Sequence, residues 1–527
     1  MTRIGSALGF SVVPLLAGAL AAMAPITTNA ETFRWGGRTD PATMDPHAQN
    51  TAPVLGFLNN VYEGLVRRGK DMGLEPALAE SWEPIEGGWR FHLRRGVKFH
   101  NGEDFTAEDV LFTWERSKSE SSSVRSFLAN SSEARIVDDF TIDIMTTAPA
   151  IFVEGIANWM ILDKGWAEAN GTLTPGGDDN YANLNANGTG AFRVADRDPD
   201  VRTVLVPFED WWDTAEHNIT EAIFTPITTQ ATRLAALLSG EIDFMEPIPP
   251  QDVDRVASTE GFKVLEAPEA RVIFLGFHHD AEALASSDLG DVNPFQDARV
   301  REAVYHAINI DPIIDRIMRG HATPAGLIID PTINGFRDEL NSRREFNQSR
   351  SRELLADAGY LDGFSFAMRC PNNRYINDEP ICTAVASMLA QVGIEVDLQT
   401  FPVRQYFGAE GPLRKGEFDM YMLGWSPGTF DAEHPIRFLM ATPGGGVGSW
   451  NFGGYSNARV DELLPRIQVE LDTAARQAMI DEVHTILRDD VVYVPLHVQP
   501  LLWAAKDNIE LSQRADNFLI LRWITVN

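Results

Sequence analysis

The strongest constraint on the fold is a strand–helix–strand pattern in the second half of the chain. Residues 364–369 (FSFAMR) form a short apolar run typical of a buried strand, and residues 380–392 have helical periodicity that Gly393 ends. Residues 394–400 (IEVDLQT) then alternate between apolar and polar side chains, as a second strand would. Two strands joined through a helix favour parallel pairing, so the pattern predicts a mixed α/β protein.

The same alternation recurs elsewhere. A helix over residues 229–239 leads into a strand at 242–244, and Asp297 is placed to cap another helix. Residues 311–320 begin with Asp-Pro and end in glycine, which predicts one more helix. The stretch 491–505 is again strand-like; such a late strand can return to a sheet that begins early in the chain and make one domain discontinuous.

The first 30 residues are typical of a secretory signal peptide. A short basic start is followed by an apolar run over residues 4–24 and by the small residues Thr28-Asn29-Ala30. A membrane anchor is the alternative, but Pro14 and Pro25 interrupt the run and no cysteine offers a lipid attachment point. We therefore expect cleavage, export to the periplasm, and a remaining chain long enough for two large domains or three smaller ones.

Charge and cysteine content narrow the function. The net charge of −31, from 44 basic and 75 acidic residues, argues against binding to nucleic acid or to an anionic membrane surface. Cys370 and Cys382 are the two cysteines. In an oxidising compartment they are expected to form a disulfide; a metal site or redox pair would need a nearby histidine or CxxC spacing, which the sequence lacks.

The most distinctive stretch is residues 78–116. It contains a predicted strand at 89–94, an Asn101-Gly102 turn, and a capping box at Thr106 that opens a helix. His92 and His100 lie close to these turns, where structural hydrogen bonding is favoured over metal binding.

This stretch, "ESW…W.F.LR.GVKFH.G..FTAEDV.FT", resembles the family 5 extracellular solute-binding proteins, the dipeptide, oligopeptide and nickel type that serves ABC importers. The resemblance spans residues 33–500, and further segments match in order: GTGAF at 188–192, LAALLSGEID at 234–243, NPFQDARVREAVYHAINID at 293–311 and NFGGYSNARVD at 451–461.

The resemblance implies a bilobed periplasmic-binding-protein fold with an extra subdomain on lobe I, the cluster C type. By analogy, lobe I comprises residues 31–272 and 499–527, with the extra subdomain at 76–192, and lobe II comprises 273–498. A ligand would bind between the lobes, whose closure signals occupancy. Residues 78–116 would then be scaffold without ligand contact.

Residues 424–428 (GWSPG) follow a predicted strand and fit G-x-S-x-G, the turn that presents a nucleophilic serine. A serine hydrolase using Ser426, with Asp461 and either His484 or His497 downstream, is therefore one hypothesis. The oxyanion hole of such a site uses the N–H of the next residue, and Pro427 has none. The sequence thus favours a ligand loop carrying Trp425.

The resemblance places this GW segment, Gly424 to Gly428, at the ligand site of lobe II. Peptide-binding relatives carry an Asp four residues after the glycine, where it anchors the peptide amino group; this chain has Gly428 there. Asp431 and Glu433 lie further along and could replace it if the loop is longer, a point that the resemblance leaves open. This departure weakens the case for ordinary dipeptide binding.

A second predicted contact is Arg374 beside Tyr375, in a loop that the expected disulfide would tether. An arginine can hold a carboxylate with two parallel hydrogen bonds, although an exposed surface arginine is the alternative. The resemblance adds weaker ligand contacts at Asn50 and Thr51 from lobe I and at Ser449, Trp450 and Asn451 from lobe II.

These observations predict a non-enzymatic periplasmic receptor, monomeric and without cofactor, that delivers peptides or peptide-like solutes to an ABC permease and its ATPase. Arg374 and a carboxylate would recognise the charged ends of the solute, and Trp425 and Trp450 would cover its apolar parts. An opine, an oligosaccharide or a metal chelate is the alternative cargo.

Overall fold

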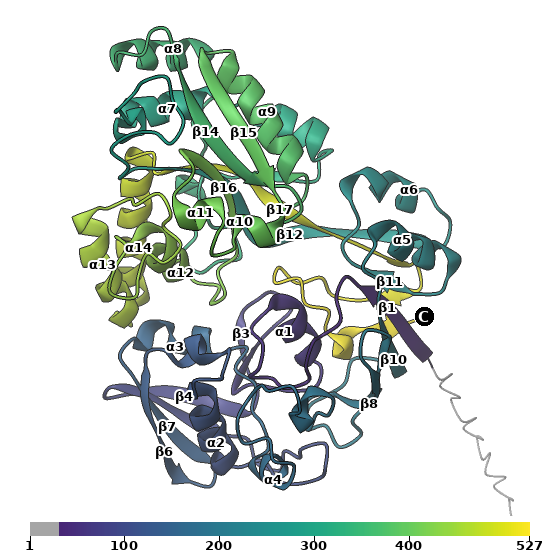
Figure 1. The fold of residues 1–527 in the computed structure, drawn as a ribbon. Helices are drawn as coiled ribbons and strands as arrows, with labels where there is room; N and C mark the ends of the chain where they lie inside the picture. The colour runs from purple at the N-terminus through teal and green to yellow at the C-terminus, as the bar shows by residue number, and fades with distance from the viewer. Residues whose placement is uncertain (1–30) are drawn as a thin grey trace, which may run out of the picture.

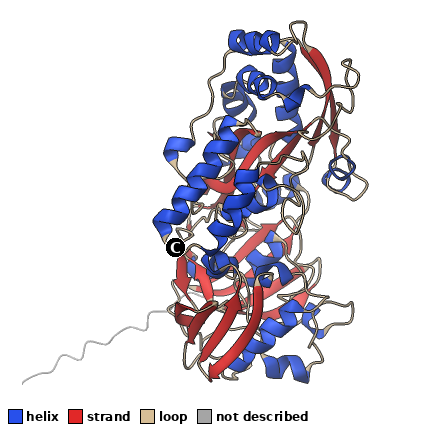
Figure 2. Cartoon of the chain, turned by 90° about the vertical axis from the view of Figure 1, so that its left-hand side faces the viewer, coloured by secondary structure: helices blue, strands red, loops and turns tan. Residues whose placement is uncertain are grey.

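A computed structural model describes residues 31–527; the predicted signal peptide, residues 1–30, lies outside the described residues. The chain forms two α/β lobes stacked one above the other, and two long strands, β12 (Phe262–Phe277) and β17 (Tyr493–Lys506), run between them (Figure 1). The view turned by 90° shows strands through the middle of an elongated molecule with helices outside them (Figure 2). The predicted bilobed fold is confirmed. The lower lobe in Figure 1 is the lobe I of the sequence analysis, and the upper lobe is lobe II.

One eleven-stranded sheet passes through both lobes in the order β15-β14-β16-β12-β17-β11-β1-β10-β9-β8, with β13 paired to β17. The late strand β17 lies beside β11 and so returns to a sheet begun by the first strand, as its sequence suggested. Its strands are β1 (Glu31–Gly37), β8 (Phe192–Asp198), β9 (Arg202–Pro207), β10 (Ile219–Pro226), β11 (Phe244–Met245), β12, β13 (Thr323–Pro324), β14 (Phe364–Pro371), β15 (Ile394–Phe401), β16 (Met420–Trp425) and β17.

The pairing of β12 with β17 is interrupted where the chain passes from one lobe to the other. Pro268 lies opposite Pro500, and the register shifts before Val272 pairs with Val498. Proline has no N–H to donate, so this pair contributes no donor to the ladder. On one side of the break β17 continues to β11 in the lower lobe; on the other side β12 pairs with β16 in the upper lobe. The two lobes are therefore joined at this interruption, and β12 and β17 are called the hinge strands for that reason.

The lower lobe surrounds the parallel pairings of β1 with β10 and β11, and its core is aromatic. Phe33, Trp35, Phe57 and Phe224 stack or meet edge to face beneath the sheet. The helices of this lobe are α1 (Ala52–Leu58), α5 (Gln230–Ser239) and α6 (Val253–Ala257), with a two-stranded unit of β2 (Val66–Arg68) and β3 (Leu74–Pro76) and, near the C-terminus, β18 (Ile509–Glu510) with β19 (Thr525–Val526).

A separate antiparallel sheet, in the order β4-β5-β7-β6, extends the lower lobe and encloses its own apolar core around Phe91 and Trp159. The predicted capping box is present, because the Thr106 side chain and Asp109 cap the start of α2. The elements are β4 (Ala79–Ile85), β5 (Gly88–Leu93), α2 (Ala107–Lys118), β6 (Ser131–Asp138), β7 (Thr141–Thr146), α3 (Pro149–Gly155) and α4 (Lys164–Ala169).

In the upper lobe the predicted strand–helix–strand unit is present: β14 and β15 pair in parallel over eight residues, with α9 between them. Asp297 caps its helix as predicted, but residues 311–320 contain a five-residue π-helix, Ile313–Ile317, in place of an α-helix. The helices are α7 (Ala298–Ala307), α8 (Gln348–Asp357), α9 (Asp378–Ala390), α10 (Val403–Tyr406), α11 (Pro412–Lys415), α12 (Glu433–Pro435), α13 (Ala458–Val469) and α14 (Thr473–Asp489).

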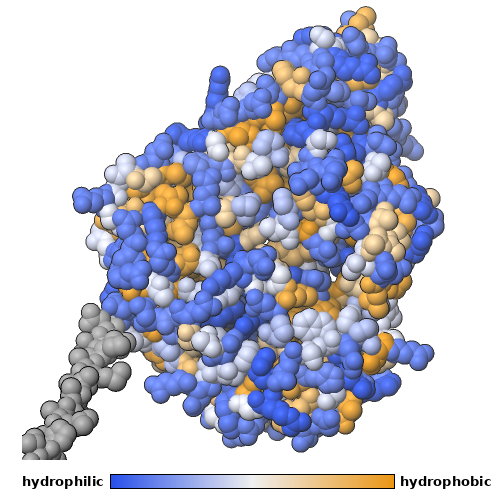
Figure 3. All heavy atoms as spheres, turned by 180° about the vertical axis from the view of Figure 1, so that it is seen from behind, coloured by the Kyte–Doolittle hydropathy of each residue, from blue (hydrophilic) through white to orange (hydrophobic). Residues whose placement is uncertain are grey.

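The surface seen from behind is mainly hydrophilic, with apolar residues in separate patches (Figure 3). Within residues 31–527, no helix combines the length and the apolar character needed to cross a membrane.

A buried ion pair joins the distinctive 78–116 stretch to the lower lobe. Arg116 at the end of α2 donates two hydrogen bonds, of 2.7 and 2.8 Å, to the carboxylate of Asp45, and both side chains are fully buried. The same guanidinium donates to Nδ1 of His47 and to the carbonyl of Thr172. This network ties the four-stranded subdomain to the lobe.

We expect Arg116→Ala to lower the free energy of unfolding by about 3–5 kcal/mol, because it leaves the Asp45 carboxylate buried without its cation. Urea denaturation would measure this. The control, Arg202→Ala, breaks an ion pair with Asp196 in which both side chains are more than half exposed, and should cost less than about 1 kcal/mol. Equal effects of the two substitutions would contradict the structural role of Arg116.

Candidate ligand-binding cleft

A cleft of about 1100 Å³ lies between the two lobes and is lined by both. That is the size range of sites for small organic solutes, at its upper end. The lower lobe contributes Trp35, Arg38, Asn50, Thr51, Phe57, Phe224, Glu246 and Asp516; the hinge strands contribute Glu269, Arg271 and Gln499; the upper lobe contributes Arg374, Tyr375, Gly424, Trp425, Ser426, Gly428, Phe430 and Trp450.

Trp425 ends β16 and presents its indole to the cleft. Its Nε1–H donates to Nδ1 of His434 at 3.2 Å, and its ring packs against Phe438 and Trp450. Burial and the positive charge of Arg437 lower the pKa of His434 to about 3, so its ring is neutral and can accept this bond. Trp425 is therefore held in one orientation.

Gly424 has no room for a side chain. A Cβ there would lie 2.6 Å from Ile273 and 2.7 Å from the ring of Tyr375. The Tyr375 hydroxyl donates to the Gly424 carbonyl at 3.3 Å, which joins the loop that carries Arg374 to the loop that carries Trp425.

Ser426 lines the cleft, but its surroundings differ from those of a nucleophile. Within residues 31–527 its hydroxyl makes no hydrogen bond to a histidine, and the nearby His434 accepts from Trp425. His484 and His497 are buried away from the cleft lining, and Asp461 accepts hydrogen bonds from Thr442. No helix begins directly after β16, so the loop is not a strand–helix elbow.

The loop after Ser426 is bound by the opposite lobe. Arg68 of β2 donates to the carbonyl of Thr429 at 2.7 Å, and its guanidinium lies 5.1 Å from the centre of the Phe430 ring. Glu154 of α3 pairs with the same guanidinium. The arrangement links the lobes directly at the edge of the cleft.

Gly428 is exposed in the cleft, and a Cβ there would meet only His434 at 3.6 Å. The expectation that Asp431 or Glu433 replaces a carboxylate here is wrong. Both side chains are fully buried inside lobe II, where Asp431 accepts two hydrogen bonds from Arg476 and Glu433 pairs with Arg437. Each carboxylate is paired with an arginine, and neither side chain belongs to the lining of the cleft.

Two further predicted contacts do not reach the cleft. Asn451 is buried and its side chain bonds the backbone at Ala441 and Tyr455, which makes it a loop-stabilising residue. Ser449 is exposed outside the lining, although its neighbour Trp450 belongs to it. Ser449 and Trp450 lie in a turn, and only the second of them lines the cleft, so a motif match does not settle which residue faces the ligand.

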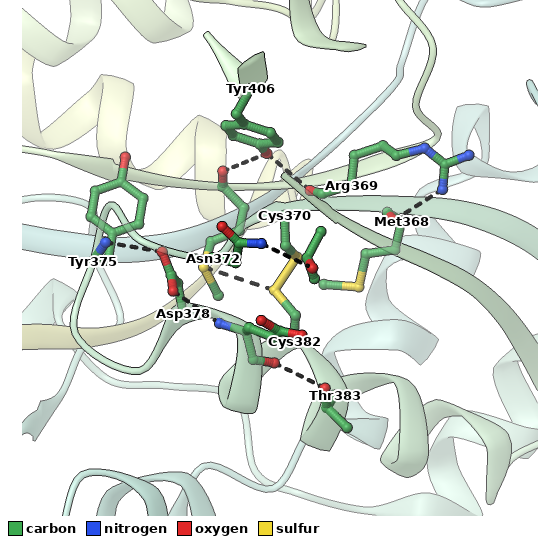
Figure 4. The surroundings of a disulfide bond; sticks show 12 residues. Met368, Arg369, Cys370, Asn372, Tyr375, Asp378, Cys382, Thr383 and Tyr406 are labelled. Atoms are coloured by element: carbon green, nitrogen blue, oxygen red, sulfur yellow. Dashed lines mark hydrogen bonds between the residues drawn. A yellow bond between two sulfur atoms is a disulfide. The ribbon is translucent and has the colours of Figure 1, made fainter. Parts of the chain in front are cut away.

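The loop that carries Arg374 is fixed at both ends. Cys370 and Cys382 form the predicted disulfide, which joins the end of β14 to α9. Inside the loop, the Asp378 carboxylate accepts a hydrogen bond from the backbone N–H of Arg374 at 2.9 Å. It accepts another from the N–H of Tyr375 at 3.0 Å (Figure 4). The Arg374 side chain is left free to extend into the cleft.

A polar chain connects this loop to the hinge. The side-chain oxygen of Gln499 accepts from the Ile376 N–H at 3.0 Å, and its amide nitrogen donates to Glu269. Glu269 also pairs with Arg271 at 2.9 Å. Burial opposes the charge of Arg271, but the Glu269 carboxylate outweighs it and raises the pKa of Arg271. The loop position is thus coupled to the two strands on which the lobes turn.

Sequence reasoning missed Arg38 and Glu246. Arg38 directly follows β1 and Glu246 directly follows β11, and these strands pair in parallel, so their carboxyl ends meet at one edge of the sheet. Ligands bind at such edges in open α/β sheets. A charged residue directly after an apolar strand was the available signal.

Glu246 is one of three acidic residues that line the cleft. Its Oε2 atom is buried and has no hydrogen-bond partner among the described residues. Burial raises its pKa to about 8, with Glu269 and Asp516 adding to the effect and Arg233 opposing it. Glu246 is therefore mainly protonated at pH 7. Glu269 and Asp516, the other lining carboxylates, are paired with Arg271 and Arg514.

Within residues 31–527, no group of three or more His, Cys, Asp or Glu side chains is arranged to hold a metal ion.

Comparison with known proteins agrees with this architecture. The family model for bacterial extracellular solute-binding proteins, family 5, matches residues 73–446. The glutathione-binding protein GsiB of Salmonella choleraesuis is 25% identical over 477 residues, covering 89% of each chain. The periplasmic binding protein DppA of Helicobacter pylori, solved with the peptide STSA, has a TM-score of 0.73 at 23% identity and covers 94% of this chain and 98% of its own. AgaA of Agrobacterium tumefaciens, solved with agropinic acid, has a TM-score of 0.73 at 22% identity, covering 94% and 99%.

Replacing both cysteines by serine should lower the free energy of unfolding by about 3 kcal/mol, because the unfolded chain regains the freedom of the closed loop. Chemical denaturation of the Cys370→Ser/Cys382→Ser variant would measure the change. A matched control is the wild type after reduction, which should show the same loss; an unchanged midpoint in both would contradict the stabilising role of the bond.

The stability of the ligand-free protein should fall as pH rises from about 4.5 to about 8 because of Glu246. Its pKa is higher in the folded state than in the unfolded state, so the folded protein binds more protons in this window and loses stability as they dissociate. The contribution is up to roughly 1.4 kcal/mol per pH unit. In Glu246→Gln this contribution disappears, so urea denaturation at pH 5, 6.5 and 8 should show a shallower decline.

The control is Glu241→Gln, at an exposed glutamate of the same segment, which should follow the wild type. Parallel profiles for all three proteins would exclude this role of Glu246.

Proposed function

Because the chain belongs to the family 5 extracellular solute-binding proteins, we propose that it is the receptor of an ABC importer that captures peptides or peptide-like solutes between its lobes. The observation that carries this proposal is the cleft itself. It is lined by Arg374, which has no carboxylate partner among the described residues, and by the packed aromatic rings of Trp425 and Trp450.

Each group has a role in holding such a solute. Arg374 binds a carboxylate through two parallel hydrogen bonds, and its loop is held in place by the disulfide and by Asp378, which lowers the entropy cost of binding. Trp425 and Trp450 cover apolar side chains of the solute. Glu246 is mainly protonated at pH 7, so it does not supply the charge of the carboxylate that Gly428 lacks, but its carbonyl oxygen can accept a hydrogen bond from an amino group of the solute.

The domain boundaries that fit this function are those inferred from the sequence: 31–272 with 499–527 for lobe I, including 76–192, and 273–498 for lobe II. Both changes of lobe fall within β12 and β17, close to the opposed Pro268 and Pro500. The interlobe contact of Arg68 with Thr429 belongs to the closed form, in which a filled cleft is presented to the transporter.

We further infer that the protein is exported to the periplasm by its cleaved N-terminal segment, acts as a monomer without catalysing a reaction, and passes its solute to a membrane permease driven by an ATPase. The relatives support the transport role, since one is described as a glutathione-binding protein and another as a periplasmic binding protein associated with an ABC transporter.

An opine is the second candidate cargo. Two observations favour it: Gly428 provides no carboxylate for an amino group, and the cleft contains guanidinium groups. An opine carries several acidic groups that such guanidinium groups can bind. The structural likeness to AgaA, described with agropinic acid, adds the opine to the test panel.

The proposal is tested by releasing and identifying the solute. Purified protein is denatured, the co-purifying small molecules are analysed by mass spectrometry, and candidate peptides, opines, sugars and metal chelates are then compared by thermal shift with refolded protein. A ligand at about 100 times its Kd should add roughly 2.7 kcal/mol of stability. A sugar that stabilises the protein where peptides do not would overturn the proposal.

For the solute so identified, Arg374→Ala should weaken binding roughly ten- to a hundredfold in calorimetry, because a charge-assisted hydrogen-bond pair is lost. Arg404→Ala is the control, since Arg404 is exposed and lies outside the cleft lining. Ser426→Ala should leave any turnover and binding nearly unchanged; covalent labelling of Ser426 by a serine-reactive probe would favour a hydrolase.

A further inference from the structure

We propose that Arg38 of lobe I is a second anion-binding residue of the cleft, so that the receptor selects peptide-like solutes with at least two carboxylates, one bound by each lobe. This rests on the proposed function and names the charge class of its solute.

The position of Arg38 is fixed by the sheet. It follows β1 directly, at the edge where β1 and β11 end together, and its exposed side chain lines the cleft. Arg34, four residues earlier on the same strand, pairs with Asp243 and lies outside the lining. Arg38 has no carboxylate partner among residues 31–527. The paired Arg34 on β1 thus lies outside the cleft, and the unpaired Arg38 directly after β1 lies within it.

The two other arginines of the cleft also differ in whether a carboxylate pairs with them. Arg271 on the hinge strand is neutralised by Glu269, whereas Arg374 in lobe II has no such partner among the described residues. Desolvation between the lobes, followed by the charges of Arg271 and Arg38, lowers the pKa of Arg374. Arg38 and Arg374 line the same cleft from different lobes, and the positive charge of each opposes that of the other.

The charge balance of the lining points to an anionic solute. Glu269 and Asp516 are paired, and Glu246 is mainly protonated at pH 7, so Arg38 and Arg374 leave an excess of positive charge. The whole chain carries −31, so this excess is local to the cleft and opposite in sign to the protein. Unpaired charges partly removed from water are costly unless a ligand neutralises them.

Closure of the lobes gives the two arginines a selective role. As the cleft closes, like charges on opposite lobes approach in a medium of reduced dielectric and oppose the movement. A solute with one carboxylate neutralises one guanidinium and leaves the other. A solute with two carboxylates neutralises both and bridges the lobes, so its binding energy favours the closed form.

The test compares two tripeptides that differ by one carboxylate, alanyl-glutamyl-glycine and alanyl-glutaminyl-glycine, by calorimetry with refolded full-length protein. We expect the glutamyl peptide to bind roughly tenfold or more tightly. The difference should shrink in Arg38→Met, recover in part in Arg38→Lys, and persist in the matched control Arg34→Met. It should also decrease with added salt.

The outcomes separate this inference from the function on which it rests. Equal affinities for the two peptides, or a preference that survives in Arg38→Met, would overturn the role of Arg38 and leave the peptide receptor intact. If neither peptide binds, the solute released from the purified protein decides: a peptide-like solute with fewer than two carboxylates overturns the inference alone, one with two or more supports it, and a solute of another class overturns both. Circular dichroism of each variant would confirm folding.

Discussion

The structure depends on the pairing of β12 with β17. These strands belong to both lobes at once, and along most of their length the antiparallel ladder makes them rigid. At Pro268 and Pro500 the ladder has no N–H donors, so the pairing that joins the lobes is interrupted next to the cleft. Glu269, Arg271 and Gln499 lie on these strands, so groups that line the site are positioned by the same segment that joins the two lobes.

Both ligand loops are built by the same principle, in which the backbone is fixed and one side chain is left exposed to the cleft. The disulfide and Asp378 hold the loop of Arg374, whereas His434 orients Trp425. The Tyr375 ring on Gly424 joins the two loops. Preorganisation of this kind lowers the entropy lost on binding and leaves selectivity to the few groups that remain unpaired.

Pairing within the protein separates structural charges from candidate ligand contacts. Asp431 and Glu433 are paired with arginines inside lobe II, and Asp45 and Arg116 are paired with each other in lobe I. Arg38, Arg374 and Glu246 are the lining groups whose charge or hydrogen-bonding capacity is not used up in this way among the described residues. A cleft in which these three groups remain unpaired suits an acidic, amphoteric solute.

The sequence by itself determined the family, the α/β class, the parallel β14–β15 unit, the capping box at Thr106 and the cysteine pair, because each follows from local periodicity or from contiguous motifs. It also identified Pro427 as incompatible with an oxyanion hole, since a missing N–H is a property of the residue alone. Only the tertiary structure decided that Asp431 and Asn451 are structural and that Arg38 and Glu246 line the cleft. Those roles depend on which partners lie within reach of each side chain, and the partners come from residues far away in the chain.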